Sequence, residues 1–367
     1  MTIQDDDLYF KLSYTTDNIS FTDDEKAFKS FPEDGVLKYE KNDKKLVVTT
    51  DASGNIVYEI NGGQKKTTLT EEEKNFVAGV IRVMIQYGVG AKERVARIYK
   101  NGGTKAVMDE VKNMKTDYVR AIFLQFLVST DNLSASDMTD IANDAQNLIS
   151  SDYEKGKLLG SFSGKYLGNA ATAKAFLQAV KSINSDYEKA KAVKGILHQE
   201  LSDEQFSNVL DITNTINSDY EKAGVLGEVI AGNKISASRF TELVRAITKI
   251  SGDYEKANVL KKVFESGVRV PDNAFTQTLD AAATISSDYE KAGVLKKLAQ
   301  SEIKSDENWK SLINATTKLG GDYEKGETLR FIATKMPGSV AVKDAYMQSA
   351  KTISGDYEYG KTVKAIQ

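Results

Sequence analysis

The sequence has no cysteine, and it has only three prolines, one histidine and one tryptophan among its 367 residues. Without cysteine the chain forms no disulfide and has no thiol nucleophile, a composition that suits an oxidising compartment without requiring one. The single histidine, His198, lacks the further His, Cys or carboxylate ligands of a zinc site, so we expect it at the surface near a helix end. No phosphate-loop, serine-hydrolase or zinc-protease motif is present. The sequence therefore predicts no catalytic, cofactor-binding or metal-binding residue, and no enzyme.

Long apolar segments and long runs of one charge are also missing. No stretch of 18 apolar residues occurs, which predicts no membrane span. The 49 basic and 52 acidic residues are interspersed and give a net charge of −3, so no basic run predicts a nucleic-acid groove. Residues 1–7 do not form a signal peptide. Either the protein stays in the cytoplasm, or a leader was removed and Met1 was added during expression.

The dipeptide Asp-Tyr, in contrast, recurs eight times at steps of 33–35 residues. The aspartates of these pairs are Asp117, Asp152, Asp186, Asp219, Asp253, Asp288, Asp322 and Asp356. Self-similarity at this period predicts stacked repeats, each of them a pair of helices.

The residues around each Asp-Tyr pair have the pattern of a helix start. Ser287 is a suitable N-cap residue and Glu290 follows three positions later, as in a capping box. The same pattern occurs at Ser151/Glu154, Ser185/Glu188 and Ser218/Glu221, and glycine takes the cap position at Gly252, Gly321 and Gly355. The Asp and Glu lie in the first turn, where the helix dipole favours negative charge.

Residues at fixed distances from each Tyr predict a packed helix face. Three positions on, the residue is small: Ala121, Gly156, Ala190, Ala223, Ala257, Ala292, Gly326 and Gly360. Six positions on, it is Leu or Val: Leu124, Leu159, Val193, Leu226, Leu260, Leu295, Leu329 and Val363. Nine positions on, it is large and apolar: Leu127, Phe162, Ile196, Val229, Val263, Leu298, Ile332 and Ile366. We therefore expect each unit to be a helix A, a turn of two or three residues, and a helix B that starts at Asp-Tyr.

The N-terminal region has the period of β-strands instead. Leu8, Phe10, Leu12 and Tyr14 alternate with polar or exposed-type residues, and further strands are predicted at 36–40, 46–50 and 56–60. Residues 51–55 predict the turn between the last two strands. The alternative, a calcium loop, lacks the spaced carboxylates and the closing glutamate.

Two helices follow the strands. Thr70 and Glu73 form a capping box for the first, which Gly88 and Gly90 end. The second ends at residues 101–103. The predicted fold is mainly α: an α-solenoid of about eight two-helix repeats with a small N-terminal antiparallel β region. The predicted domains are a β-rich region at 1–68, linking or capping helices at 69–103, and the repeat array at 104–367.

Four kinds of residue are considered as candidates for function. The eight tyrosines would form a row able to bind peptides or glycans, but we expect their rings to be buried between repeats with the hydroxyls at the rim. The column Lys155, Lys189, Lys222, Lys256, Lys291 and Lys325 would have to line a groove to bind nucleic acid; we expect it to form charge ladders between repeats. Trp309 is expected to pack in a helix A. A glycosidase carboxylate pair should be singular, whereas these carboxylates repeat.

The run Ile-Ser-Ser-Asp-Tyr-Glu-Lys-Ala at 285–292, with Val294 and Leu295, resembles the HEAT-like helical repeats in the extracytoplasmic regions of bacterial BlaR-type membrane metallopeptidase sensors and related uncharacterised proteins. Residues 19–21, 35–39 and 56–62 are similar to the β-segment that precedes such repeats. The metal motif and membrane spans of the peptidase are missing here. The resemblance implies an extracytoplasmic binding or sensing module and no catalysis.

Together these features predict a non-enzymatic binding or scaffold module. The expected partner is a protein, a peptide or a cell-envelope glycan, bound at the concave face of the array or at the β region, where side chains do not repeat. The alternatives are a nucleic-acid-binding helical array and a carbohydrate-active enzyme. The expected location is periplasmic or extracellular, with the cytoplasm left open.

Overall fold

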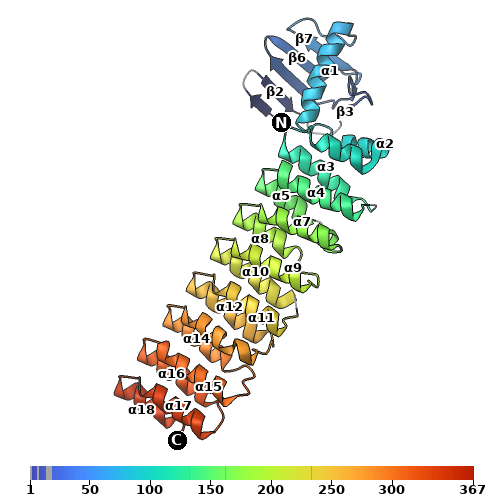
Figure 1. The fold of residues 1–367 in the computed structure, drawn as a ribbon. Helices are drawn as coiled ribbons and strands as arrows, with labels where there is room; N and C mark the ends of the chain where they lie inside the picture. The colour runs from blue at the N-terminus through green and yellow to red at the C-terminus, as the bar shows by residue number, and fades with distance from the viewer. Residues whose placement is uncertain (1, 6–7, 14–18, 132, 162, 233) are drawn as a thin grey trace. The chain divides into compact units, whose positions relative to one another are not determined.

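The computed structural model describes residues 2–5, 8–13, 19–131, 133–161, 163–232 and 234–367 (Figure 1). It divides into two compact units, Met1–Glu154 and Lys155–Gln367, and the boundary falls inside helix α5 (Asp152–Ser161). The architecture is helical with a small N-terminal antiparallel β region, which confirms the predicted fold class. None of the described helices is long and apolar enough to cross a membrane.

The first unit begins with antiparallel strands. These are β1 (Thr2–Asp5), β2 (Leu8–Ser13), β3 (Ser20–Phe21), β4 (Phe28–Ser30), β5 (Val36–Lys41), β6 (Lys44–Thr50) and β7 (Ile56–Ile60). Five of them form one sheet in the order β1-β2-β5-β6-β7, and β3 pairs with β4. Phe10, Tyr39 and Leu46 lie opposite one another across β2, β5 and β6, so one face of the sheet is apolar.

The predicted strands at 36–40, 46–50 and 56–60 are confirmed, as is the alternation of Leu8, Phe10 and Leu12, which are buried while their neighbours are exposed. Tyr14 lies outside the described residues. Residues 51–55 form the predicted hairpin turn, in which the Asp51 carboxylate accepts the backbone N–H groups of Ser53 and Asn55. Strands β1, β3 and β4 were not predicted.

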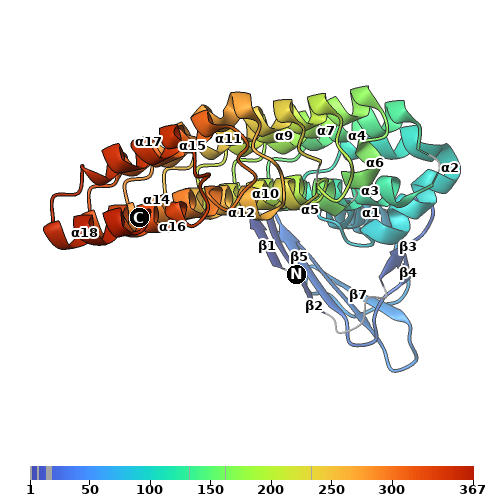
Figure 2. The same ribbon diagram turned by 90° about the horizontal axis from the view of Figure 1, so that it is seen from below.

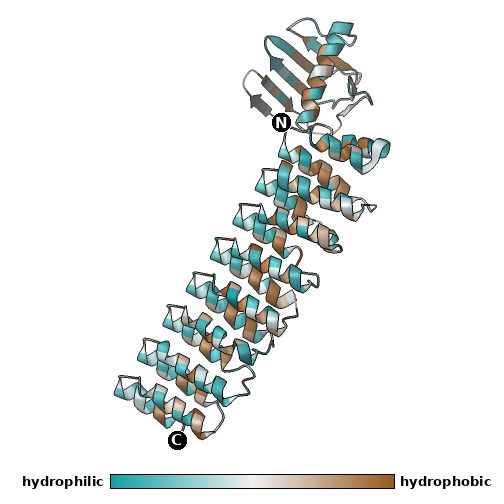
Figure 3. Ribbon diagram, in the orientation of Figure 1, coloured by the Kyte–Doolittle hydropathy of each residue, from teal (hydrophilic) through white to brown (hydrophobic). Residues whose placement is uncertain are grey.

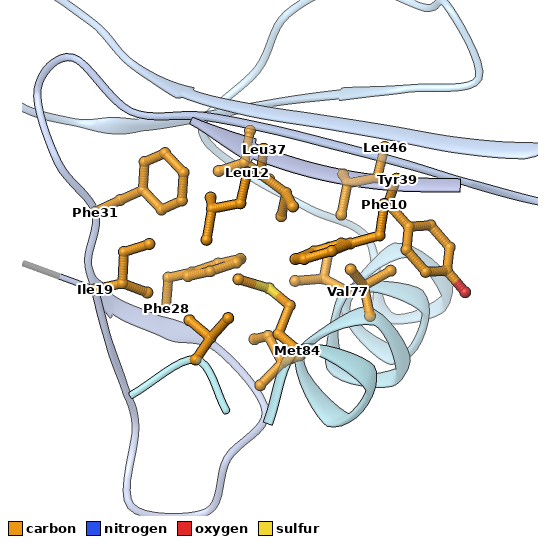
Figure 4. Close-up of a cluster of buried hydrophobic side chains, with 14 of the residues drawn as sticks. Phe10, Leu12, Ile19, Phe28, Phe31, Leu37, Tyr39, Leu46, Val77 and Met84 are labelled. Atoms are coloured by element: carbon orange, nitrogen blue, oxygen red, sulfur yellow. The ribbon is translucent and has the colours of Figure 1, made fainter. Parts of the chain in front are cut away.

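Helix α1 (Glu71–Gln86) packs on the apolar face of the sheet (Figure 4). Val77 and Met84 of this helix share a core with Phe10 and Leu37 of the sheet, and all four side chains are buried. The predicted Thr70–Glu73 capping box is present with both of its hydrogen bonds. The β region and its first helix therefore stabilise each other through a common core.

Three more helices complete the first unit: α2 (Ala91–Val111), α3 (Asp117–Ser129) and α4 (Ala135–Leu148). The predicted break at 101–103 takes the form of a kink in α2 at Gly103, whose φ of 66° favours glycine.

The second unit consists of paired helices. They are α6 (Ser163–Tyr166), α7 (Ala170–Lys181), α8 (Asp186–Lys194), α9 (Asp203–Asn214), α10 (Asp219–Gly232), α11 (Ala237–Ile247), α12 (Asp253–Glu265), α13 (Phe275–Ala283), α14 (Asp288–Leu298), α15 (Asp306–Ala315), α16 (Asp322–Ala333), α17 (Val340–Ala350) and α18 (Asp356–Lys364). Single 3-10 turns precede α13 and follow α15, at Asp272–Ala274 and Thr316–Lys318. Two layers result, with α7, α9, α11, α13, α15 and α17 in one and α8, α10, α12, α14, α16 and α18 in the other (Figure 2).

Each predicted B helix begins at its Asp-Tyr pair, at α3, α5, α8, α10, α12, α14, α16 and α18. Most A–B turns are longer than the predicted two or three residues. They run from three residues, as between α4 and α5, to five, as between α11 and α12. The additional length is ordered by side chains of the preceding repeat, which bond to the turn.

The predicted core face of the B helices is also confirmed. Each helix carries hydrophobic and hydrophilic residues on different sides (Figure 3). Leu260, Leu295 and Leu329, six positions after Tyr, are at most 1% exposed. Phe162, at one of the nine-on positions, lies outside the described residues.

Candidate functional site

Six of the eight motif aspartates hold the turn of the following repeat. In α14, the Asp288 carboxylate accepts the backbone N–H groups of Gly320 and Gly321 at 2.8 and 2.9 Å, directly before α16. The same two-fold acceptance occurs at Asp117, Asp186, Asp219, Asp253 and Asp322. Each carboxylate therefore satisfies donors that a helix start leaves unpaired, and it places the N-terminal ends of consecutive B helices side by side.

The lysine three residues later holds the other side of the same turn. Lys291 is 7% exposed, and its Nζ donates to the carbonyl of Lys318 at 3.1 Å, where the preceding helical segment ends. Its equivalents donate at 2.9–3.1 Å to Ser182 Oγ, Thr215 Oγ1, Lys249 O, Thr284 Oγ1 and Thr352 O. A buried cation thus lies at the C-terminal end of each A helix of the second unit, where the dipole favours positive charge.

Two predictions for these residues were wrong in detail. The six lysines neither line a groove nor form a charge ladder between repeats, because they are 4–7% exposed and bond mainly to carbonyl and hydroxyl oxygens of the next turn. Only one of the two hydrogen bonds of the predicted capping box forms. Ser287 Oγ accepts the Glu290 N–H, but the Ser287 N–H donates to Asp253 of the previous repeat and not to Glu290. Neighbouring repeats therefore supply part of each other's caps.

This arrangement predicts how Asp253 contributes to stability. The N–H groups of Ser286 and Ser287 lower the pKa of its carboxyl. A lowered pKa means a contribution that is present above the unfolded-state pKa, about 3.9, and is lost as the pH falls through the folded-state value. We expect Asp253→Asn to lower the free energy of unfolding by about 1–2 kcal/mol at neutral pH, because a neutral amide is a weaker acceptor.

Urea unfolding between neutral and acidic pH checks this, and the difference between wild type and variant should close below about pH 4. The control is Asp356→Asn, because Asp356 bonds no following turn within the described residues. An equal loss of stability in both variants, or a loss independent of pH, would show that the turn contacts are not responsible.

The tyrosines of the motif are exposed, so the prediction that their rings are buried was wrong. Tyr118 and Tyr153 in the first unit are 53% and 56% exposed. The six in the second unit, called the tyrosine row, are 59–77% exposed: Tyr187, Tyr220, Tyr254, Tyr289, Tyr323 and Tyr357. Because the N-terminal ends of consecutive B helices are adjacent, the row follows one edge of their layer at a spacing of about 8–10 Å.

The sequence held a signal for both corrections. A residue advances about 100° around a helix, so a position two or nine residues after Tyr lies about 160–180° away from it. Lys291 and Leu298 have these positions relative to Tyr289. The lysine therefore shares the buried side of the helix with the apolar residues, whereas the tyrosine lies opposite.

The surroundings of the tyrosine row differ along its length. Three residues before each Tyr, at the turn, the residue is small or polar and exposed: Asn184, Asn217, Ser251, Ser286, Gly320 and Ser354. At the two ends an ammonium lies over the ring, with Lys191 Nζ 6.0 Å from the Tyr187 centroid and Lys361 Nζ 4.7 Å from that of Tyr357. Next to the central tyrosines, four positions on, lie the uncharged residues Gly224, Asn258 and Gly293.

Three of the glutamates that follow Tyr form ion pairs with a neighbouring repeat. Lys261 Nζ contacts Glu290 at 2.7 Å, Arg330 Nη1 contacts Glu358 at 2.7 Å, and Lys194 Nζ lies 3.6 Å from Glu221. These ion pairs do join successive repeats, but they use a basic residue seven positions after Tyr. Most charged side chains of the motif are therefore bonded to neighbouring repeats.

A second polar cluster lies in the first unit. A pocket of about 320 Å³ is lined by Lys29, Glu93, Arg94 and Arg97, among others. Glu25 accepts hydrogen bonds from both Arg94 and Arg97, and Arg94 also contacts Glu110 at 2.9 Å. Carboxylates thus neutralise the arginines, and the cluster ties α2 to the loop before β4.

The other singled-out residues lie as expected. His198 is exposed, four residues beyond the end of α8, and Trp309 in α15 is 5% exposed. Among the described residues, no group of three or more His, Asp or Glu side chains is placed to hold a metal ion.

Comparisons with known proteins add little to this geometry. No family model and no curated protein matches the chain. Among solved structures, a computationally designed self-assembling cyclic homooligomer matches at 13% sequence identity, over 75% of this chain and 92% of the designed one. The TM-score is 0.14, which is too low to support any comparison of the two structures.

Proposed function

We propose that this protein is a non-enzymatic binding module that recognises a protein, peptide or cell-envelope ligand, and that it does so through the tyrosine row and not through the non-repeating side chains that the sequence favoured. The observation that carries this proposal is that the tyrosine is identical in all eight copies and 53–77% exposed. The identical aspartate has a structural task wherever its bonds to a following turn are seen, whereas the tyrosine has little buried surface to explain its retention.

Variation among the copies supports this argument. Four positions after Tyr, on the same side of the helix, the residues are Ile122, Lys157, Lys191, Gly224, Asn258, Gly293, Glu327 and Lys361. A neighbouring surface position has therefore diverged freely while the tyrosine has not. Exposed tyrosines supply large, rigid contact area at low entropic cost, and they are enriched in binding surfaces.

The nucleic-acid alternative loses its main support, because the six lysines that it requires are buried. For the location, the lack of cysteine and the resemblance to extracytoplasmic repeats support a periplasmic or extracellular site of action.

Arrays of proteins, peptides and envelope glycans probed with the labelled chain test the proposal. We expect specific binding that the triple variant Tyr220→Ala, Tyr254→Ala, Tyr289→Ala loses, and no turnover of glycosides, peptides, esters or phosphoesters. The proposal is wrong if the triple variant binds every ligand like the wild type. A turnover abolished by changing one non-repeated carboxylate to its amide would also overturn it.

A further inference from the structure

We infer that the central part of the tyrosine row, Tyr220, Tyr254 and Tyr289, is a platform for a neutral linear polysaccharide. The inference rests on the proposed binding function and specifies its ligand. These three include the most exposed rings of the row, Tyr220 at 76% and Tyr289 at 77%, with Tyr254 at 63%.

The platform can contact both the apolar face and the polar rim of a sugar ring. A pyranose ring has an apolar C–H face that stacks on an aromatic side chain, and hydroxyl groups around its rim that need hydrogen-bond partners. The platform offers both: the exposed turn residues Asn217, Ser251 and Ser286 lie on one side of the tyrosines, and Asn258 lies on the other. The phenol hydroxyls add further donors and acceptors.

The charged groups next to the three rings are mostly paired or buried. Asp219, Asp253 and Asp288 use their carboxylates to accept backbone N–H groups of the next turn, and the adjacent lysines are buried. Glu221 and Glu290 face Lys194 and Lys261. No ammonium lies over the three central rings among the described residues, in contrast to Tyr187 and Tyr357. Most charged groups next to the three rings are thus paired or buried, with Glu255 as the exception, and such a surface complements an uncharged polymer better than a polyanion.

The rings of the platform recur at a regular spacing, and few other large apolar side chains are exposed in the described part of the chain. Stacked helices place one ring about every 8–10 Å along a line, which suits a linear ligand with a repeating structure. Apart from the motif tyrosines, the large hydrophobic side chains exposed in the described part of the chain are Tyr9 and Val340. The row therefore lacks the contiguous apolar centre of a protein interface.

Affinity electrophoresis and calorimetry with soluble neutral glucans, xylans, mannans and chitin oligosaccharides test the inference. An acidic polysaccharide, a proline-rich peptide and a single-stranded oligonucleotide serve as comparison ligands. We expect at least one neutral polysaccharide to bind, with little change between low and high salt. The affinity should rise with oligosaccharide length until the chain spans the three rings, because each additional contact becomes intramolecular.

The variants make the test specific. Tyr220→Ala, Tyr254→Ala, Tyr289→Ala should reduce the affinity at least about tenfold, because the three stacking contacts along one chain are lost together. The corresponding Phe variant keeps the rings and should retain most of the affinity. The control variant Glu228→Ala, Lys262→Ala, Lys297→Ala changes residues eight positions after the same tyrosines and should bind like the wild type.

Three results would overturn the inference. In the first, no neutral polysaccharide binds; if a peptide, protein or oligonucleotide then binds in a tyrosine-dependent way, the proposed binding function stands and only the ligand class is wrong. In the second, a polysaccharide binds equally to wild type and the triple Ala variant. In the third, sedimentation shows a dimer that the triple Ala variant disperses, which would make the row an interface between copies of the chain.

Discussion

Replacing Leu295 by alanine should lower the free energy of unfolding of the second unit by about 2–5 kcal/mol. Leu295 is 1% exposed on α14, whose neighbours in the layer are α12 and α16. Removing its side chain therefore leaves a cavity between repeats that stacked helices fill only in part. The measurement is chemical unfolding followed by the fluorescence of Trp309, which is the sole tryptophan and lies buried in α15 of the same unit.

Two companion variants make this result interpretable. Ala257→Leu should destabilise by about 1–3 kcal/mol through overpacking, because Ala257 is fully buried at the position where neighbouring helices approach closely. Tyr289→Ala, on the same helix as Leu295 but 77% exposed, should change stability by less than about 0.5 kcal/mol. If neither core variant lowers stability, the assignment of the buried face is wrong.

Replacing Lys291 by alanine should lower the free energy of unfolding by about 3 kcal/mol, although the change removes a buried charge. The Lys291 ammonium donates to the Lys318 carbonyl and lies 3.8 Å from Asp288 Oδ1, and its stem is buried with it. The alanine variant leaves the carbonyl without its donor and the stem's volume empty. The same unfolding experiment measures the loss.

Lys291→Met separates the two contributions. Methionine keeps the apolar stem and removes the ammonium, so this variant should lower the free energy of unfolding by about 1–2 kcal/mol. The remaining part of the alanine effect is then the loss of packing by the stem. A methionine variant more stable than the wild type would show that the buried ammonium is a net cost, as occurs for some buried charges.

Much of this fold was predictable because it depends on local chemistry. The Asp-Tyr pairs give the helix starts, since a cap residue and an early carboxylate define an N-terminus without reference to the rest of the chain. The alternation at Leu8, Phe10 and Leu12 likewise gives a strand with one buried face. The two-residue strand at Ser20–Phe21 was missed because two residues carry no period.

The role of the motif could not be predicted from local chemistry, because it depends on the neighbouring repeat. Lysine is a residue type that usually lies at the surface. Lys256 is nevertheless only 4% exposed, because Thr284 of the next repeat accepts its hydrogen bond. Tyr254 was assigned to the buried stripe because it precedes small and apolar residues at intervals of three. Each step of three residues moves the position by about 60° around the helix. The apolar residue nine positions on therefore lies on the side of the helix opposite the tyrosine.

We interpret the repeated motif as dividing its tasks, with Asp and Lys holding the next turn and Tyr left exposed for the proposed contact with a ligand. The most direct test is the free energy of unfolding of Tyr254→Ala compared with Asp253→Asn and Lys256→Met, three variants within one turn of α12. The account predicts that the tyrosine variant stays within about 0.5 kcal/mol of the wild type while each neighbour loses about 1–2 kcal/mol. A tyrosine variant as unstable as its neighbours would contradict it, because the row would then be retained for folding.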